Sequence, residues 1–381
     1  MRPRPDKPRA VEFFAGIGLV RLALENQGWK VVLANDFDAS KAEIYRQNWS
    51  DDLIQGDIRD LAAEQIPDCE LFTASFPCND LSIAGRWEGL NGAKSSAFWR
   101  VIELLDEMGS RKPPLVLLEN VVGFLLRRNG ADLAEALSAL SQRGYCVDAL
   151  LLNAKHWVPQ SRARLFIVAK ELRDRPNAAA RRDPPPSHTR PEALVRFIRS
   201  HPELPWDLQP LPDPPDGALA LKDILEDLPD SSDEWWSEDR AGYFMQQLSD
   251  RHLEEANRMI AGRSISYATA FRRMRNKKSM AELRTDGIAG CLRTPRGGSA
   301  RQILFKAGKN RYQVRLLTAR ECARLQGVRD DYGFRADVPL NRALFGFGDA
   351  VCVPVIEWIA EHYLNPIARD YGLRDASAAH A

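Results

Sequence analysis

The sequence predicts an α/β protein in which a sheet, with helices on both faces, is joined to a smaller, irregular domain. In the first part of the chain, short apolar runs alternate with helical segments at the spacing of parallel βαβ units. Ten of the 24 prolines then lie between Pro184 and Pro215, where they exclude helix interiors and central strands. Beyond them the periodicity is weak and basic side chains are concentrated.

The individual elements follow from apolar runs and the turn residues that bound them. The runs that predict buried strands are residues 10–14, 30–34, 71–76, 115–118 and 165–168. The segments that predict helices are residues 19–26, 39–48 and, near the C-terminus, 350–364. We therefore expect a first domain over residues 1–175, a second over 176–335 that begins with the proline-rich linker, and a C-terminal segment, 336–381, that rejoins the first.

Composition excludes several classes of protein. No run approaches the roughly 18 uninterrupted apolar residues that a membrane span needs. Residues 1–9 alternate charge and proline without an apolar signal core, so we expect a cytoplasmic protein. The six cysteines are scattered, with no close pair and no histidine at metal-ligand spacing. This pattern argues against a disulfide framework and against a metal site.

The distribution of charge points to nucleic acid, although the net charge of +1 does not. Between Ala256 and Arg329 there are 18 Arg or Lys residues and three acidic residues. A basic block on a neutral protein is the expected footprint of a phosphate-binding face. The alternative interpretation is a solvated surface whose acidic partners lie elsewhere in the chain.

A glycine-containing turn and three acidic residues indicate a nucleoside site. Residues 13–18 lie between a strand and a helix, where glycine lets the backbone approach a ligand. Asp36 and Asp38 follow the second strand, and Asp57 follows a third element, so all three belong to one sheet edge. A dinucleotide fingerprint needs another glycine where Arg21 stands. A single nucleoside with a charged tail fits better.

A second group of residues suits covalent chemistry on a base. Cys78 follows a buried strand, Glu119 and Asn120 end the next one, and Arg162 and Arg164 precede another, spaced to lie on the same side. A thiolate that adds to C6 of cytosine makes C5 nucleophilic, and a carboxylic acid at N3 stabilises the developing charge. C5 then attacks a methylsulfonium, and loss of the C5 proton expels the thiolate. Nearby arginines would increase the thiolate fraction of Cys78.

These residues stand in the order of a known family. The chain resembles the DNA cytosine-5 methyltransferases of bacterial restriction-modification systems along nearly its whole length. The motifs that carry the resemblance are residues 14–18 (FAGIG), Pro77-Cys78, Glu119-Asn120-Val121, Gln160-x-Arg162-x-Arg164, residues 315–327 (RLLTARECARLQG) and residues 347–351 (FGDAV). The resemblance implies a Rossmann-like methyltransferase sheet and makes residues 176–335 the target recognition domain.

The resemblance also implies a role for each matching residue. Cys78 would be the nucleophile, Glu119 the partner of N3, and Asn120 would orient the loop or the base. Arg162 and Arg164 would hold cytosine and its phosphate. S-adenosylmethionine, released as S-adenosylhomocysteine, would be bound by Phe14, Gly16, Gly18, Asp36, Phe37, Asp57, Ile58, Pro77, Asp349 and Val351. The chain departs from the usual pattern at Leu19, Asp36, Asn79, Asp80 and Asp349.

The expected substrate is double-stranded DNA, bound by a monomer. Candidate DNA contacts are Ser82, Arg86 and Trp87 in a glycine-containing loop, and Arg272, Arg273, Arg275, Lys277 and Lys278 in the basic block. The alternatives are an RNA cytosine methyltransferase, an inactive nucleic-acid-binding regulator and a nucleotide-dependent oxidoreductase. The long basic insert favours duplex DNA. Cys78, Glu119 and Arg164 argue against the other two alternatives. The sequence leaves open the recognition sequence and whether a separate companion endonuclease exists.

Overall fold

A computed structural model describes residues 7–49, 52–76, 96–172, 184–217, 219–275, 277–294, 301–334 and 340–370. The chain divides into two compact units. The first comprises Met1–Asn153, Ala163–Pro214 and Val355–Ala381. The second comprises Ala154–Arg162 and Pro215–Pro354.

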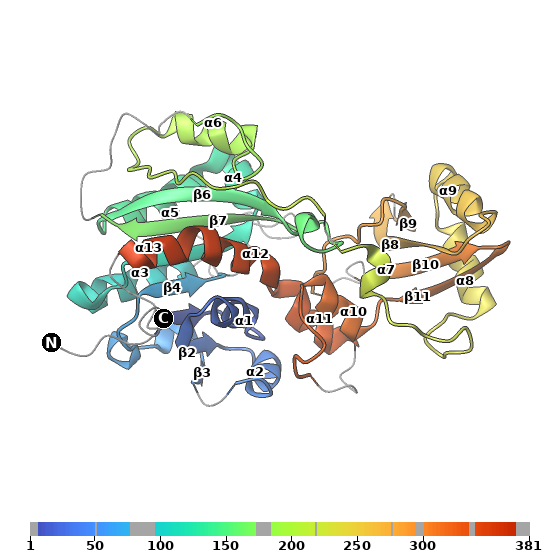
Figure 1. Ribbon diagram of the computed structural model, residues 1–381, viewed down its shortest axis with the longest axis horizontal. Coiled ribbons are helices and arrows are strands. Elements are labelled where there is room, and N and C mark those ends of the chain that lie inside the picture. Colours follow the sequence, from blue (N-terminus) through green and yellow to red (C-terminus); the bar gives the residue numbers. More distant parts are fainter. Residues whose placement is uncertain are drawn as a thin grey trace, which may run out of the picture. The chain divides into compact units, whose positions relative to one another are not determined.

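The first unit is built on a seven-stranded sheet in the order β3-β2-β1-β4-β5-β7-β6 (Figure 1). Strands β1 to β5 pair in parallel, whereas β7 pairs antiparallel with both β5 and β6. The strands are β1 (Arg9–Phe13), β2 (Lys30–Asp36), β3 (Leu53–Gln55), β4 (Leu71–Ala74), β5 (Leu115–Val121), β6 (Tyr145–Asn153) and β7 (Ala163–Glu171). The strand order reverses between β1 and β4, and ligands bind such sheets at the carboxyl ends of the strands around this point.

Helices cover both faces of this sheet, as the sequence predicts. Those that precede residue 215 are α1 (Leu19–Asn26), α2 (Ala39–Arg46), α3 (Ser96–Met108), α4 (Gly123–Leu126), α5 (Ala131–Ser141) and α6 (Glu192–Ser200). One continuous core joins alternate strand residues such as Val11 and Val116 to α3, α4 and α5. On the opposite face Asp148 of β6 accepts a hydrogen bond from Tyr363 of the C-terminal helix, 3.1 Å away.

The proline-rich segment as far as Pro214 packs in the first unit. Leu194, Phe197 and Ile198 of α6 are buried in the main core, since they recur at helical spacing on one face. Arg190 contacts the fully buried Asp148 carboxylate at 2.5 Å and 3.1 Å. Prolines exclude long regular elements here, but they do not prevent the segment from packing.

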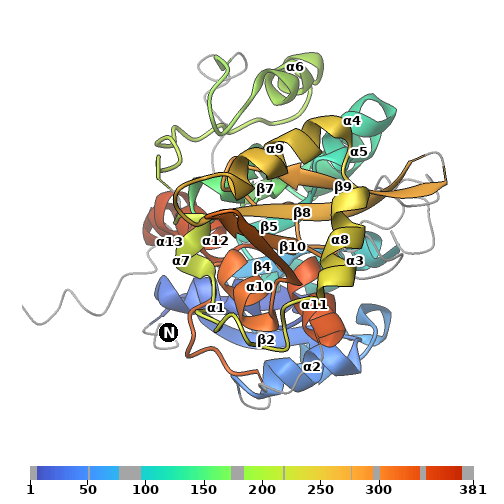
Figure 2. The same cartoon turned by 90° about the vertical axis from the view of Figure 1, so that its right-hand side faces the viewer.

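The second unit is regular, in contrast to the irregular domain that the sequence predicts. Its four-stranded antiparallel sheet has the order β11-β10-β8-β9, and helices α8 and α9 lie against the sheet (Figure 2). The strands are β8 (Ser266–Arg275), β9 (Lys278–Arg284), β10 (Ile303–Gly308) and β11 (Arg311–Leu316). The helices are α7 (Leu221–Ile224), α8 (Glu238–Gln246), α9 (Asp250–Ile260), α10 (Ala319–Leu325) and α11 (Leu340–Asp349). Its separate core includes Phe244, Ala268, Ala270 and Phe305.

The C-terminal helical stretch consists of α11, then α12 (Val353–Ile359), a π-helical turn (Ala360–Leu364) and α13 (Asn365–Asp370). Residues Leu340–Arg369 are long and apolar enough to cross a membrane by length and composition. However, 72% of their most apolar window is buried inside the protein. This burial is what a core helix requires, and it accounts for the apolar composition without a membrane.

Candidate active site

The glycine turn after β1 is fixed by Asp36 at the end of β2. The Asp36 carboxylate accepts hydrogen bonds from the backbone N–H of Gly16 at 2.7 Å and of Asp38 at 2.8 Å. The carbonyl of Asn35 also accepts a hydrogen bond from Ala15 N–H at 2.9 Å. Residues 20 positions apart in the sequence are thereby held side by side at one edge of the first sheet.

Gly18 cannot be replaced without strain. Its φ of +81° lies in the left-handed region, and an added Cβ would lie 2.4 Å from the Trp49 ring. Arg21, which stands where a dinucleotide fingerprint needs glycine, is a buried anchor for α1. It donates to Tyr45 at 2.8 Å and to Asp52 at 2.6 Å. The turn therefore has one fixed backbone path, and Arg21 has a structural role that a glycine could not fill.

Burial governs the chemistry of Asp36. Its side chain is only 5% exposed, and this burial raises its pKa above 3.8, although Lys41 and the two backbone donors act in the opposite direction. Two of its lone-pair positions are used by backbone N–H groups, and a carboxylate has about four. Asp36 therefore retains acceptor capacity for a ligand.

The neighbouring candidates for cofactor binding differ in accessibility. The Phe37 ring is 67% exposed, which is unusual for a large apolar side chain. Asp57 is paired with Arg59 at 2.6 Å, and this partner lowers its pKa. Ile58 is 3% exposed and belongs to the main core. Of these three, the Phe37 ring presents the surface most open to an aromatic ligand.

Glu12 was not among the predicted site residues, and the structure makes it a notable one. It lies on β1, 1% exposed, and burial raises its pKa well above the usual value. Its Oε2 atom has no hydrogen-bond partner among the residues that the structure describes. The signal in the sequence is an acidic residue inside an otherwise apolar strand, between Val11 and Phe13.

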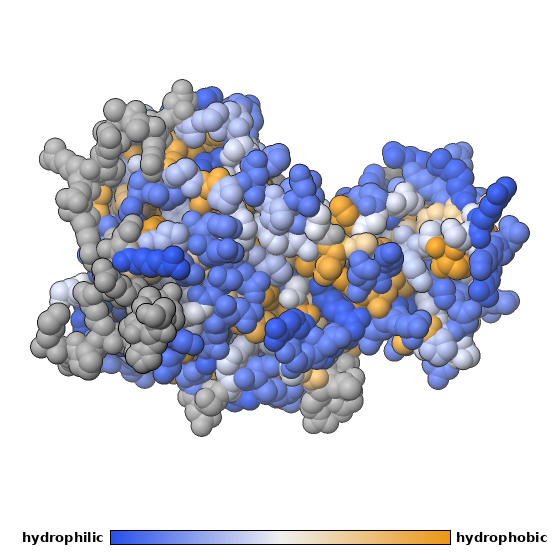
Figure 3. All heavy atoms as spheres, viewed as in Figure 1, coloured by the Kyte–Doolittle hydropathy of each residue, from blue (hydrophilic) through white to orange (hydrophobic). Residues whose placement is uncertain are grey.

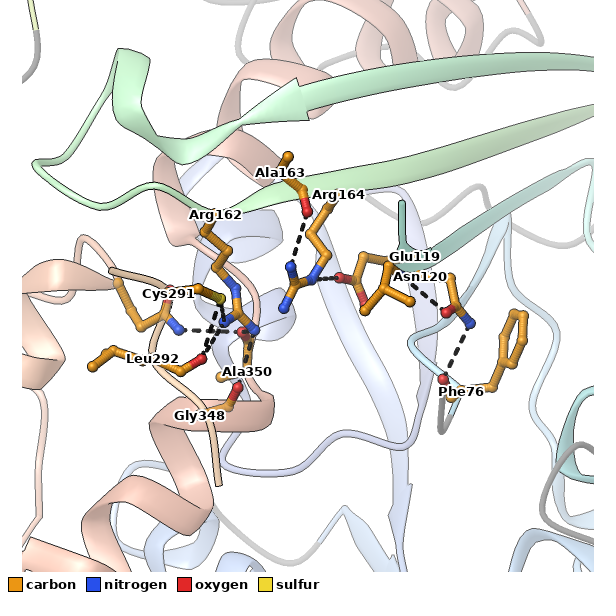
Figure 4. Close-up of polar contacts among 12 residues, drawn as sticks. Phe76, Glu119, Asn120, Arg162, Ala163, Arg164, Cys291, Leu292, Gly348 and Ala350 are labelled. Carbon is orange, nitrogen blue, oxygen red and sulfur yellow. Dashed lines mark hydrogen bonds and ion pairs between the residues drawn. The ribbon is translucent and has the colours of Figure 1, made fainter. Parts of the chain in front are cut away.

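Glu119 and Arg164 form a largely buried ion pair between two neighbouring strands. The distance from Arg164 Nε to Glu119 Oε1 is 3.0 Å, and the side chains are 16% and 10% exposed for Arg164 and Glu119, respectively (Figure 4). Glu119 lies near the end of β5 and Arg164 near the start of β7, which pair antiparallel. The ladder pairs Arg164 with Val121, two residues from Glu119, so both side chains lie on the same face of the sheet.

Asn120 connects β5 to the segment that precedes the predicted nucleophile. Its side-chain amide donates to the carbonyl of Phe76 at 3.4 Å and accepts from Val121 N–H at 2.8 Å (Figure 4). Phe76 is two positions before Cys78. Pro77, Cys78, Ser82, Arg86 and Trp87 lie outside the residues that the structure describes.

Arg162 does not share the environment of Arg164, although the spacing predicts that the two lie on the same side. It precedes β7, which begins at Ala163, so strand alternation does not apply to it. Its side chain is in the second unit, 2% exposed, and its guanidinium donates to four acceptors (Figure 4). They are Cys291 Sγ at 3.2 Å and the carbonyls of Leu292, Gly348 and Ala350 at 2.9, 3.2 and 2.6 Å.

Two glutamines extend this buried network within the second unit. Gln160 donates to the carbonyl of Leu325 at 2.7 Å and accepts from Leu292 N–H at 3.0 Å. Gln326 donates to the carbonyl of Phe347 at 2.6 Å. Both glutamines are 0% exposed. The network thus joins three of the sequence motifs, and sequence reasoning identified those motifs without anticipating this scaffolding role.

Asp349 and Val351 flank Ala350, whose carbonyl accepts from Arg162. Asp349 is the last residue of α11, and Val351 is 4% exposed. Both belong to the second unit, whereas the glycine turn and Asp36 belong to the first. Their predicted part in cofactor binding stays a prediction.

The five basic candidates for DNA binding belong to one β-ribbon. Strand β8 pairs with β10 only as far as Ala270, whereas its pairing with β9 continues to Arg275. Residues beyond Ala270 therefore form a two-stranded extension of the sheet. Arg273, Arg275, Lys277 and Lys278 are exposed on it, whereas Arg272 is half-buried.

The side chains of this ribbon point in two directions. Arg273 and Arg275 both contact Glu282, at 3.7 and 2.5 Å, and so occupy one face. Arg272 occupies the other face, where its Nε donates to Gln247 at 2.9 Å. A two-stranded ribbon has dimensions that the major groove of DNA admits.

Comparison with known proteins places this geometry in a family. Residues 9–365 match the C-5 cytosine-specific DNA methylases. The chain is 28% identical to the type II methyltransferase M.Bsp6I of Bacillus sp. (strain RFL6), over 92% of this chain and 96% of that protein. It is also 28% identical to the type II methyltransferase M.HhaI of Haemophilus parahaemolyticus, over 92% of this chain and 93% of that protein.

Solved structures share the fold at lower identity. The Dnmt2 methyltransferase of S. pombe superposes with a TM-score of 0.61 at 18% identity, over 95% of this chain and 99% of that one. The Entamoeba histolytica methyltransferase EhMeth gives a TM-score of 0.63 at 13% identity, with the same coverage. The chain thus belongs to the C-5 cytosine-specific DNA methylase family and is a DNA (cytosine-5) methyltransferase.

Proposed function

We propose that the enzyme methylates a cytosine within a specific sequence of double-stranded DNA, with Cys78 as nucleophile and Glu119 as the group that binds N3. The observation that carries the proposal is the Glu119 side chain, 10% exposed, whose carboxylate is held at 3.0 Å by Arg164. This pair fixes an acid and a cation on one sheet face. Asn120 anchors the backbone two residues before Cys78.

The residues of the first unit fit S-adenosylmethionine. Asp36 has acceptor capacity for ribose hydroxyls, and the exposed Phe37 ring offers a face to adenine. Phe14, Gly16 and Gly18 form the turn that approaches the ligand. Asp57, Ile58 and Pro77 would complete the part of the site that the first unit provides. When bound, the cofactor supplies an electrophilic methyl group.

The chain's own groups then prepare the base. The Cys78 thiolate adds to C6, which removes the C5–C6 double bond and makes C5 nucleophilic. Glu119 shares a hydrogen bond with N3, and this contact stabilises the charge that develops there. After C5 has gained its methyl group, removal of the C5 proton restores the double bond and expels the thiolate. Arg164 holds Glu119 in position and contributes positive charge to the site.

The substrate base must leave the helix first, since C6 is inaccessible to a protein thiol inside stacked duplex DNA. We assign duplex binding to the β8–β9 ribbon and to the loop that contains Ser82, Arg86 and Trp87. Arg273 and Arg275 occupy the ribbon face opposite Arg272. In this arrangement Arg162 organises the second unit and does not contact cytosine or its phosphate.

The biological setting follows from the relatives. Those compared are bacterial type II methyltransferases, which supports a role in restriction-modification. We infer that the enzyme acts as a monomer in the cytoplasm. A companion endonuclease, where one exists, acts separately on the same sequence.

A trapping experiment tests this function. Duplex DNA that contains 5-fluorocytosine should form a denaturation-resistant adduct, because fluorine cannot leave as the C5 proton does. The adduct should disappear in Cys78→Ala and persist in Cys291→Ala. Cys291 is the control because it alone is not buried among the five described cysteines. An adduct that survives in Cys78→Ala, or one that forms only with fluorinated RNA, would contradict the proposal.

A further inference from the structure

Nine of the 18 basic residues between Ala256 and Arg329 contact an acidic side chain of the second unit. Lys306 and Arg311 both contact Asp230, at 2.7 and 3.3 Å. The remaining pairs are Arg273 and Arg275 with Glu282, Arg284 with Asp286, Arg315 with Glu321, Arg320 and Arg324 with Asp330, and Arg329 with Asp331. Much of the basic block is therefore neutralised within the unit, so its total charge does not locate a binding surface.

Three of the arginines that form no ion pair among the described residues interact with one another. Arg240 lies on α8, Arg272 on β8, and Arg301 two residues before β10. No carboxylate of the described residues forms an ion pair with any of the three. Two of them make side-chain hydrogen bonds to neutral amides: Arg272 donates to Gln247 at 2.9 Å, and Arg301 donates to Asn341 at 2.6 Å.

An aromatic ring holds two of these cations together. The guanidinium carbon of Arg240 lies 4.2 Å from the centroid of the Trp236 ring, and that of Arg272 lies 5.4 Å from it. Trp236 is itself fixed, because its backbone N–H donates to the carbonyl of Val314 at 2.9 Å and its ring packs edge-on against Phe244. Arg240 and Arg272 are thus placed by stacking and by amide contacts.

The arrangement gathers like charges that repel one another. Burial, and then the neighbouring Arg240 and Arg301, lower the pKa of Arg272. A cation cluster without a counter-charge is unfavourable in isolation and becomes favourable when an anion binds. A planar guanidinium donates to phosphate oxygens in a bidentate geometry. On the face that Figure 3 shows, hydrophilic residues cover most of the second unit, with hydrophobic patches between them.

We propose that Arg240 and Arg272, which lie over the Trp236 ring, form together with Arg301 a phosphate site that holds the backbone of the substrate DNA. This proposal rests on the proposed function, because it takes duplex DNA as the ligand. It also goes further, since Arg240 lies outside the basic block and neither Arg240 nor Arg301 belongs to a motif of the family. The site binds phosphates of any sequence and leaves base recognition to other residues.

Salt titration of DNA binding tests the site. The variants Arg240→Gln and Arg301→Gln and the double variant are compared with Arg251→Gln, in which an 84% exposed arginine of the same unit is removed from its pair with Glu255. Each phosphate interaction that a variant removes should lower the slope of log affinity against log salt by about 0.9. The ratio of affinities at 50 and 200 mM salt should then fall by about 3.5-fold per variant and about 12-fold in the double variant.

Three further measurements separate the possible results. The weakening should be equal for cognate and unrelated duplexes, and Arg240→Lys should recover most of the affinity because the charge is restored. S-adenosylhomocysteine affinity should not change, which shows that the variants are folded. An unchanged slope in the double variant, or an equal change in Arg251→Gln, would overturn the site. If instead the slopes change as expected but the wild-type protein methylates no cytosine, the site stands and the proposed function fails.

Discussion

The two arginines of the Gln160-x-Arg162-x-Arg164 motif should respond very differently to the same substitution. Arg162→Lys removes the planar guanidinium group, which makes hydrogen bonds to two segments of the second unit. Nη1 donates to Leu292 and Cys291, whereas Nη2 donates to Gly348 and Ala350. An ammonium is a compact charge on a shorter side chain and cannot occupy both positions of a guanidinium.

The magnitude follows from the carbonyls that lose a donor. If lysine satisfies only the Leu292 side, the carbonyl of Gly348 is left buried without its arginine hydrogen bond, whereas the half-buried carbonyl of Ala350 keeps the hydrogen bond from Gln326 at 3.3 Å. One buried acceptor without a donor costs about 1–3 kcal/mol, so the free energy of unfolding should fall by about that amount. In Arg164→Lys a cation remains beside Glu119, so stability should change much less while turnover falls.

Differential scanning calorimetry and methyl transfer to duplex DNA, measured on both variants, test this difference. Arg162→Lys should melt at a clearly lower temperature and should lose activity chiefly because less folded enzyme is present. Arg164→Lys should melt near the wild-type temperature with depressed turnover. If Arg162→Lys keeps wild-type stability but loses turnover, then Arg162 contacts the substrate and the structural role argued above is wrong.

Three further outcomes are expected. Asp36→Asn should weaken S-adenosylhomocysteine binding by about 1.5–3 kcal/mol for each charge-assisted hydrogen bond removed, measured by calorimetry. Burial raises the pKa of Asp36 above its ordinary value. Because the ribose hydroxyl donors favour the ionised carboxylate, the affinity of the wild-type enzyme for S-adenosylhomocysteine should rise as the pH increases through this pKa. Asp36→Asn should lack this increase. Glu119→Gln should reduce single-turnover methylation by about 10²–10⁴-fold with cofactor affinity unchanged; a smaller reduction would argue against its role at N3. Gly18→Ala should destabilise the protein by about 1–3 kcal/mol in chemical denaturation, because the new Cβ would meet Trp49.

The first unit could be predicted in some detail because its central strands are short apolar runs between turn residues. The runs at 10–14, 30–34, 71–76 and 115–118 correspond to β1, β2, β4 and β5. Strand β6 was missed because Asp148 interrupts its apolar run. That carboxylate is tolerated at 0% exposure because Arg190, 42 residues away, pairs with it and because Tyr363 and two backbone N–H groups donate to it. Pattern reading within a short window cannot detect such a partner.

The second unit was predicted poorly for a related reason. The strands β8, β9 and β10 contribute Ala268, Ala270, Ala281 and Ala307 to the core that they share with α8 and α9. Alanine is depleted in strands, so these segments lack the alternation of large apolar residues that signals a sheet. Basic residues at the end of the β8–β9 ribbon weaken the signal further. The regular sheet depends on small residues packed beneath helices. This packing is a tertiary contact, which a pattern within a short stretch of sequence does not show.

The candidate site shows the same division between local and tertiary information. Asp36, Glu119 and Arg164 were predicted because each follows or begins a strand, and strand ends in a parallel sheet meet at one edge. Arg162 was assigned with Arg164 on the assumption that residues two apart in a strand share a face. Strand β7 begins only at Ala163, so Arg164 follows the alternation of side chains along the strand, whereas Arg162 precedes the strand. A motif can therefore combine residues that a mechanism requires with residues that the fold requires, and only the hydrogen-bond partners of each side chain distinguish the two.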